Sequence, residues 1–169
     1  WKFIFPDSWK ASKFDDWKFY REKFQGLANY TKAIDILAFN ADEKTVWLIE
    51  IKDFRSAPRS PQKEKKLPLD EEIALKIVNS LAGIVAARFQ ANIPDEQNQA
   101  INALRKSEKL KVAFHLIQPD KGTRLNPKPK KPSDIRQKLR QRLRAIDPHP
   151  NVWGIDDSNH DIIGTTFKP

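Results

Sequence analysis

The chain has 169 residues, 39% of them hydrophobic and 31% charged, a balance that is typical of one folded domain and excludes a disordered chain. With 31 Lys and Arg against 22 Asp and Glu, the formal net charge is +9, which favours an anionic partner such as nucleic acid. Cysteine is absent, so disulfides and cysteine-ligated metal clusters are excluded, and no apolar run is long enough to cross a membrane. We therefore expect a single domain over residues 1–169 that is cytoplasmic and does not bind a membrane. Methionine is absent too, even at position 1, so the natural start is expected upstream.

The first thirty residues predict a helix followed by a short strand. Aromatic residues recur at helical spacing after the candidate N-cap Ser12, namely Phe14, Trp17, Tyr20 and Phe24. Gly26 is expected to end this helix. Residues 27–30 then read as a first strand.

Two apolar runs, residues 32–39 and 45–52, are separated by a short polar segment and predict a β-hairpin. Alternation along the second run sends Val46, Leu48, Glu50 and Lys52 to one face, and Trp47, Ile49 and Ile51 to the other. A carboxylate and an ammonium thus leave the end of an apolar strand, where charged groups are rare unless they are paired or bind a metal. Folding the hairpin brings Asp35, the acid in the first run, towards both.

Two carboxylates and a lysine at the ends of neighbouring strands could form a catalytic site. Carboxylate oxygens bind Mg²⁺, with Mn²⁺ as the alternative, and the metal would stabilise charge on a phosphate and acidify a bound water. We expect Asp35 and Glu50 to be the metal ligands, with the main-chain carbonyl of Ile51 as a further candidate. Lys52 would orient or deprotonate the water.

The rest of the chain predicts alternating loops, helices and strands. Residues 54–68, with three prolines, read as a long surface loop, and residues 119–132, with four, as an extended one. Helices are expected over residues 69–89, 95–105 and 133–146, and strands over 110–117, 151–155 and 161–167. In the first of these helices, six residues are expected to face the core: Ile73, Ile77, Leu81, Ile84, Val85 and Phe89.

The segment from residue 121 to residue 145 carries many basic residues and few acidic ones. Its last helix should point Ile135, Leu139, Leu143 and Ile146 inward, which leaves its cations outside. We expect this segment to bind nucleic-acid phosphates through six residues: Lys128, Lys130, Lys131, Arg136, Arg140 and Arg144. The alternative is an ordinary solvated surface.

Asp35 followed by Glu50-Ile51-Lys52 resembles the motif of the PD-(D/E)XK nuclease superfamily, which has the restriction-endonuclease-like fold. In that family the Asp lies on the second core strand and the Glu-x-Lys on the third. Ile34 stands where many members have proline. The resemblance implies a three-layer α/β fold with an αβββαβ core and a mixed central sheet flanked by helices. It also implies catalytic roles for Asp35, Glu50 and Lys52. Members of the family sometimes supply a further acid from the first helix, but we expect Glu22 to be at a solvated helix position and leave it out of the site.

Three interpretations remain open at the level of sequence. The first is a Mg²⁺-dependent nuclease, with DNA favoured as the substrate. The second is a catalytically inactive nucleic-acid-binding module on the same fold. The third is a structural domain that is not related to an enzyme and whose charges only solvate its surface, so that Glu50 and Lys52 form an ion pair on a solvated strand end and Asp35 lies in an irregular turn. The oligomeric state is open, a homodimer included. Both nuclease-fold interpretations require Asp35, Glu50 and Lys52 to converge within a few ångströms at one end of a mixed sheet.

Overall fold

The computed structural model describes residues 2–3, 5–29, 31–57, 59–90, 92–119, 122, 129–154 and 166–167. Its strands are β1 (Lys2–Phe3), β2 (Trp9–Lys13), β3 (Ile36–Asn40), β4 (Thr45–Asp53), β5 (Lys109–Ile117), β6 (Asn151–Trp153) and β7 (Thr166–Phe167). Its α-helices are α1 (Pro61–Lys66), α2 (Leu69–Arg88), α3 (Asp95–Lys106) and α4 (Pro132–Leu143). A 3₁₀ turn, η1 (Phe14–Asp16), and a π-helical turn, η2 (Tyr20–Phe24), complete the elements.

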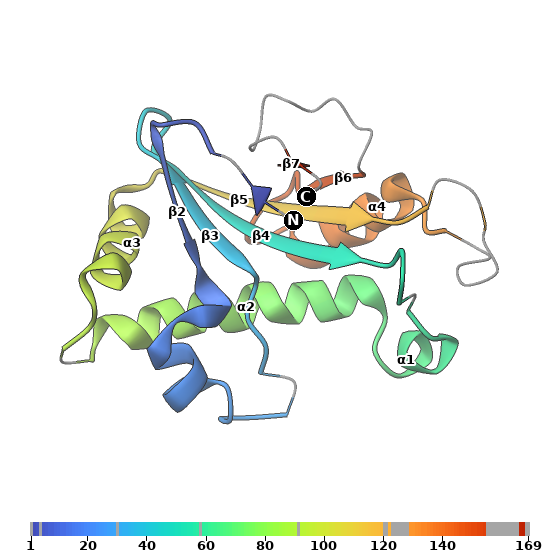
Figure 1. The fold of residues 1–169 in the computed structure, drawn as a ribbon, viewed down its shortest axis with the longest axis horizontal. Helices are drawn as coiled ribbons and strands as arrows, with labels where there is room; N and C mark the ends of the chain where they lie inside the picture. The colour runs from blue at the N-terminus through green and yellow to red at the C-terminus, as the bar shows by residue number, and fades with distance from the viewer. Residues whose placement is uncertain are drawn as a thin grey trace.

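Five strands form one mixed sheet in the order β2-β3-β4-β5-β6 (Figure 1). The first three are an antiparallel meander, and β5 and β6 are parallel to their neighbours. The predicted hairpin is confirmed: β3 and β4 pair with Ile36 opposite Ile49, and the Asn40 side-chain oxygen accepts bonds from the Asp42 and Glu43 N–H groups in the turn. The expected α/β class with a mixed sheet is therefore correct.

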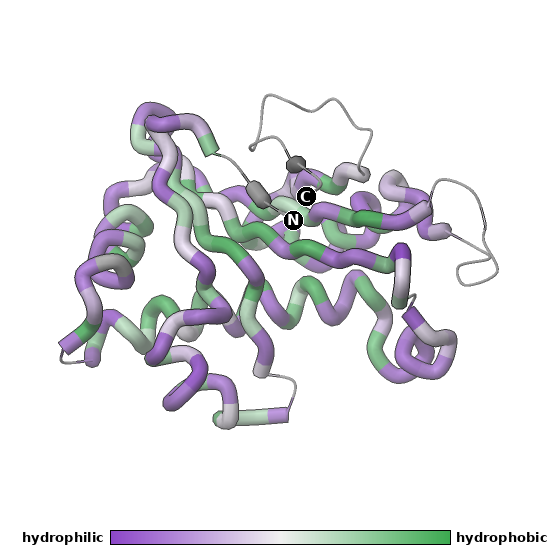
Figure 2. The backbone as a smooth tube through the Cα atoms, in the orientation of Figure 1, coloured by the Kyte–Doolittle hydropathy of each residue, from purple (hydrophilic) through white to green (hydrophobic). Residues whose placement is uncertain are grey.

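The two faces of the sheet pack against different material, as the alternation in β4 predicted. Val46 and Leu48 belong to the larger core cluster, together with Ile77 of α2, Ile101 of α3 and Leu139 of α4. The opposite face carries a smaller cluster of five buried residues, Ile36, Ala38, Trp47, Ile49 and Ala113. Glu50 shares the face of Val46 and Leu48, so its carboxylate points toward the helices. Figure 2 shows the hydrophobic stretches along β3, β4 and α2, and the hydrophilic α1.

Helix α2 lies along the sheet and supplies most of the helical core (Figure 1). Three acids in its first turn complement the helix dipole, and Ile73, Ile77 and Ile84 are buried as predicted. Val85 and Phe89 were predicted to face the core, but they are 56% and 78% exposed. The face that is actually buried is set by the period of 3.6 residues and includes four polar residues, namely Asp70, Glu72, Lys76 and Ser80.

The N-terminal prediction was wrong in its elements. Ser12, the expected N-cap, lies in β2, which forms the first strand of the meander by pairing with β3. The aromatic residues after it are buried, but they do not share one continuous helix: Phe14 lies in η1, Trp17 is the extended residue after it, and Tyr20 and Phe24 lie in η2. Residues 27–29 form no strand, and Tyr30 lies outside the described residues. The aromatic spacing predicted burial correctly, because it indicates which side chains pack in the core. Two short helical turns can bury the same side chains as one continuous helix.

Two further predictions need correction, and a third lies largely outside the described residues. The loop 54–68 contains α1, which begins after Ser60, whose hydroxyl oxygen accepts a hydrogen bond from the Lys63 N–H at 3.2 Å. Helix α4 begins at Pro132 after Lys131, so Ser133 is not its N-cap, and it ends at Leu143. The last predicted strand, residues 161–167, lies largely outside the described residues, and only Thr166–Phe167 form a strand there.

Candidate active site

The structure brings Asp35, Glu50 and Lys52 together at one end of the sheet. Asp35 immediately precedes β3, and Glu50 and Lys52 lie near the end of the neighbouring antiparallel strand β4. The Asp35 N–H donates to the Ile49 carbonyl at 3.2 Å, which continues the ladder by one residue. The predicted convergence is therefore confirmed.

Asp35 is held by the backbone of β4. Its Oδ2 accepts a hydrogen bond of 2.6 Å from the Ile51 N–H, and its side chain is 28% exposed. A carboxylate fixed through one oxygen keeps the other available for a cation. Asp35 is thus more ordered than a residue in an irregular turn.

Glu50 is the most deeply buried member, with a side chain that is 0% exposed. Its Oε1 contacts two ammonium groups, Lys52 Nζ at 2.5 Å and Lys76 Nζ at 2.6 Å. Its Oε2 is buried and has no hydrogen-bond partner within the described part of the chain. Burial raises the pKa of Glu50, the charges of Lys76 and Lys52 only partly offset this, and the pKa is about 7. This strand end is not solvated at Glu50.

Lys76 is the member that sequence reasoning missed. It lies on the buried face of α2, its side chain is 9% exposed, and its Nζ lies 3.7 Å from Asp35 Oδ1. Burial alone lowers the pKa of Lys76, but the Glu50 and Asp35 carboxylates overcome this and raise it, so Lys76 is charged. A lysine within the apolar stripe of a helix was the signal that could have identified it.

Ser80 fixes the position of Lys76 relative to β3. It is fully buried one turn further along α2, and its hydroxyl donates to the Lys76 carbonyl at 2.7 Å. The same oxygen accepts from the Ile34 N–H at 2.9 Å. The residue before Asp35 is thereby tied to the turn of α2 that carries Lys76.

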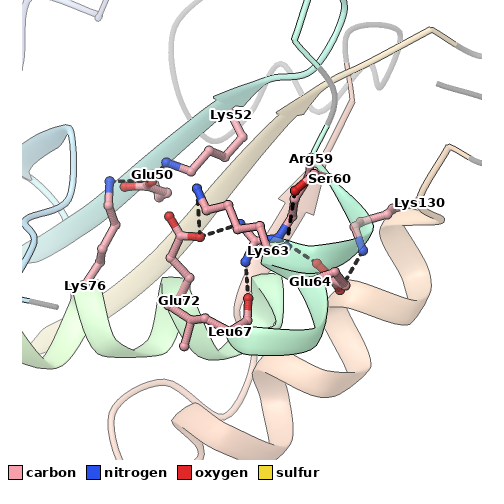
Figure 3. A network of polar contacts seen from close by, with 10 residues as sticks. All are labelled: Glu50, Lys52, Arg59, Ser60, Lys63, Glu64, Leu67, Glu72, Lys76 and Lys130. Carbon is pink, nitrogen blue, oxygen red and sulfur yellow. Dashed lines mark hydrogen bonds and ion pairs between the residues drawn. The ribbon is translucent and has the colours of Figure 1, made fainter. Parts of the chain in front are cut away.

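A second group of charges extends from this cluster toward α1 (Figure 3). Arg59, with a side chain only 3% exposed, forms ion pairs with Glu72 and Glu64 and also donates to the Leu67 carbonyl. Glu64 in turn contacts Lys130 Nζ at 2.7 Å. Burial raises the pKa of Glu72, but Arg59 outweighs it and holds this pKa below its ordinary value. The expected surface loop therefore contains a buried arginine.

A cavity of about 180 Å³ adjoins the cluster beside Lys76. It is lined by Lys32, Lys63, Lys66, Leu67, Glu72, Leu75 and Lys76. Lys63 Nζ lies 3.6 Å from Glu72 Oε2, so at least one of the lysine head groups is directed to the acid in this wall. Lysines thus predominate in the wall of this cavity, which lies beside the cluster of Asp35, Glu50 and Lys52.

Glu22 is exposed on η2, as expected for a solvated position outside the site. Asp15 of η1 lies closer to the cluster: its pKa is raised by burial and by the negative charge of Asp35. Even so, no group of three or more His, Cys, Asp or Glu suited to a metal ion occurs among the residues that the structure describes. The cluster itself contains two carboxylates, those of Asp35 and Glu50.

The six residues predicted to bind nucleic acid are in different situations. Lys128 lies outside the described residues, and Lys131 is exposed. Lys130 is paired with Glu64, and the Arg136 guanidinium donates to the Val152 carbonyl at 2.7 Å. Arg140 and Arg144 are exposed at and just beyond the end of α4. Part of the predicted basic surface is therefore used for internal contacts.

Comparison with known proteins gives one partial match. The chain is 30% identical to a cysteine–tRNA ligase of Neisseria meningitidis serogroup A over 172 aligned positions, which cover 86% of this chain. The match spans only 24% of the ligase. No protein-family model matches the chain. No solved structure matches it significantly either. Within the described residues, no helix is long and apolar enough to span a bilayer.

Proposed function

We propose that this chain is a metal-dependent nuclease domain of the PD-(D/E)XK class that hydrolyses phosphodiester bonds, with DNA favoured as the substrate. The observation that carries the proposal is the placement of Asp35 and Glu50 on neighbouring strand ends, with Lys52 bound to Glu50. The antiparallel β2-β3-β4 meander followed by the parallel strand β5 supports the restriction-endonuclease-like topology.

The donor set fits a hard divalent cation. Glu50 Oε2 is buried without a partner among the described residues, and Asp35 Oδ1 has only a long contact to Lys76 at 3.7 Å. Mg²⁺ is commonly bound by one or two carboxylates together with water and substrate phosphate. We expect Asp35 and Glu50 to hold Mg²⁺ or Mn²⁺, which would supply Lewis-acid stabilisation of charge on the phosphate.

The protein's own residues would bind and orient the substrate. Lys52 is 21% exposed and held by Glu50 Oε1, so its ammonium can orient a water and stabilise negative charge on the phosphate. Asp35 is fixed by the Ile51 N–H, which keeps its free oxygen directed at the reacting centre. Lys63 and Lys66 border the adjoining cavity and place positive charge where a polyanionic strand would approach.

The partial match to a tRNA ligase adds tRNA to the substrates that need testing. That relative is a ligase by name, and the aligned part is about a quarter of it. We therefore carry over only the expectation of a nucleic-acid partner.

A second function is favoured by one observation. The Lys76 ammonium lies between the two acids and balances them without a metal. This arrangement would suit a catalytically inactive nucleic-acid-binding module on the same fold.

Cleavage assays separate the two functions. Plasmid, linear duplex, single-stranded DNA and tRNA would be incubated with Mg²⁺, Mn²⁺ or EDTA. We expect cleavage only with metal, loss of cleavage in both Asp35→Asn and Lys52→Ala, and largely preserved metal binding in Lys52→Ala. Metal binding by the wild type without cleavage of any substrate would favour the inactive module.

Thermal melts of the same variants test whether Asp35 is structural. In EDTA, Asp35→Asn should change the stability by no more than about 1 kcal/mol. The amide oxygen can still accept a hydrogen bond from the Ile51 N–H, and Lys76 retains its ion pair with Glu50. Asp35→Asn should also abolish the stabilisation by Mg²⁺ that the wild type shows. A loss near 3 kcal/mol without any metal response in the wild type would instead identify a buried structural ion pair.

A further inference from the structure

The space between the two acids already holds a cation from the protein itself. Lys76 Nζ lies 2.6 Å from Glu50 Oε1 and 3.7 Å from Asp35 Oδ1, and it reaches this place from a different element, α2. A divalent ion bound to both carboxylates would need the same region, since its oxygen ligands lie about 2.1 Å away. Two like-charged cations at such separations repel strongly in a buried site.

We propose that Lys76 is a resident counter-cation, which a divalent metal ion displaces when it binds Asp35 and Glu50. The inference rests on the proposed function for the identity of the metal site, but not for catalysis.

The charge balance supports displacement rather than joint binding. When Glu50 is ionised, which is the form that binds a metal, Asp35 and Glu50 contribute −2 and Lys52 and Lys76 contribute +2, so the four side chains sum to zero. If a divalent ion is added with Lys76 in place, the net charge of the site becomes +2. If Lys76 moves away, the net charge of the ion and the three remaining side chains is +1. Lys76 would therefore act as a built-in competitor that lowers metal affinity and neutralises the acids when no metal is bound.

The structure also offers Lys76 a place to move to. Lys76 lines the cavity of about 180 Å³, and Glu72 forms part of the same wall. A change of side-chain rotamer would bring the ammonium toward the Glu72 carboxylate, which Arg59 also pairs with and whose contact with the half-exposed Lys63 is long at 3.6 Å. The Lys76 backbone would stay in place because Ser80 ties this turn of α2 to Ile34. The motion is thus confined to one side chain.

Metal affinity measured without any substrate tests the proposal. Binding of Mn²⁺ would be followed by the electron paramagnetic resonance signal of the free ion, for the wild type, Lys76→Met and Lys111→Met. Lys111 is the matched control, because it too pairs with a buried acid, Asp147, at 3.4 Å. It lies on β5, which carries none of the site residues. Lys76→Met should bind Mn²⁺ about tenfold more tightly or better, and Lys111→Met should bind as the wild type does.

A second measurement needs no loss of the lysine. The ammonium signal of Lys76 in ¹⁵N-lysine-labelled protein, assigned by its absence in Lys76→Arg, should shift when Mg²⁺ is added. Lys76→Arg keeps the positive charge and should bind metal no more tightly than the wild type. Wild-type affinity in Lys76→Met, or a Lys76 signal unchanged at saturating Mg²⁺, would overturn the proposal.

The results also separate this inference from the nuclease proposal. Tighter metal binding in Lys76→Met with no cleavage by any variant would support the counter-cation and reject the nuclease. Cleavage by the wild type with unchanged affinity in Lys76→Met would do the opposite. Absence of Mn²⁺ binding in every variant would overturn both.

Discussion

At the scale of single residues, two buried titratable groups have pKa values displaced in opposite directions. Burial raises the pKa of Glu50 to about 7 and lowers the pKa of His115 to about 4. His115 lies on the opposite face of the sheet from Glu50, with its ring 5.3 Å from that of Trp153. Burial favours the uncharged form of both groups, which raises the pKa of the acid and lowers that of the base.

The two groups have opposite effects on stability. The raised pKa of Glu50 gives stability that is fully present below pH 4.5 and is lost as the pH rises through 7. The lowered pKa of His115 gives stability that is present above pH 6.5 and is lost as the pH falls through 4. Each is worth up to about 3 kcal/mol, so their slopes should offset between pH 4.5 and 6.5.

Substitution should therefore unmask each slope. In EDTA, the unfolding free energy of Glu50→Gln should rise from pH 4.5 to 6.5, and that of His115→Phe should fall as the pH rises from 4.5 to 7. Lys76, whose pKa is raised by the Glu50 and Asp35 carboxylates, remains charged throughout this range and does not change the slope. Urea titrations at several pH values measure this directly. A Glu50→Gln curve parallel to that of the wild type would show that Glu50 does not titrate there.

At the scale of elements, the attachment of α2 to the start of β3 decides whether the site is assembled. The Ser80 hydroxyl accepts the buried Ile34 N–H, so removing it leaves a donor without a partner. Ser80→Ala should cost about 1–3 kcal/mol in unfolding free energy. Ser133→Ala on the exposed face of α4 serves as the control and should change it by less than about 0.5 kcal/mol.

Ser80→Ala should also weaken the metal response. Without this bond, the turn of α2 that carries Lys76 can shift relative to Asp35. We expect less well-defined metal binding, seen as a smaller Mg²⁺-induced rise in melting temperature than in the wild type. Equal stability in Ser80→Ala and Ser133→Ala would show that the bond does not hold the two elements together.

At the scale of the whole molecule, the net charge of +9 is unevenly placed with respect to the site. Arg140 and Arg144 are exposed at the end of α4, and Lys63 and Lys66 border the cavity beside the site. Arg105 and Lys106 lie at the end of α3, just before the start of β5, whereas the site is at the far end of β4. Equal changes in charge can thus be compared at three places.

We expect nucleic-acid binding to depend on the first two places and not on the third. The paired changes Arg140→Gln with Arg144→Gln, and Lys63→Gln with Lys66→Gln, should weaken binding regardless of sequence. Each should also reduce the dependence of affinity on salt by about one unit for every phosphate that the protein no longer neutralises. Arg105→Gln with Lys106→Gln removes the same charge and should have little effect. Equal weakening by all three pairs would mean that only the net charge matters.

Local patterns in the sequence determined the hairpin, the faces of its strands and the course of the main helices. Alternation in residues 45–52 placed Glu50 and Lys52 on the helix-facing side, because side-chain direction in a strand is a local property. Local patterns also located α2, α3 and β5, whose predicted and observed bounds differ by only about one residue. Asp35 joined the cluster because a short hairpin fixes which end of β4 its strand meets.

The tertiary structure alone decided which further groups meet these residues. Lys76 reaches Asp35 and Glu50 because one turn of α2 crosses the strand ends, and no local pattern fixes that crossing. Burial of Arg59 likewise depends on Glu72 and Glu64 lying beside it once α1 and α2 have packed. Spacing also could not distinguish a helix from the strand β2 and two short turns, because all of them can bury the same aromatic rings. Charges in a core are balanced through space, so the partner of a predicted acid is found only when the chain has folded.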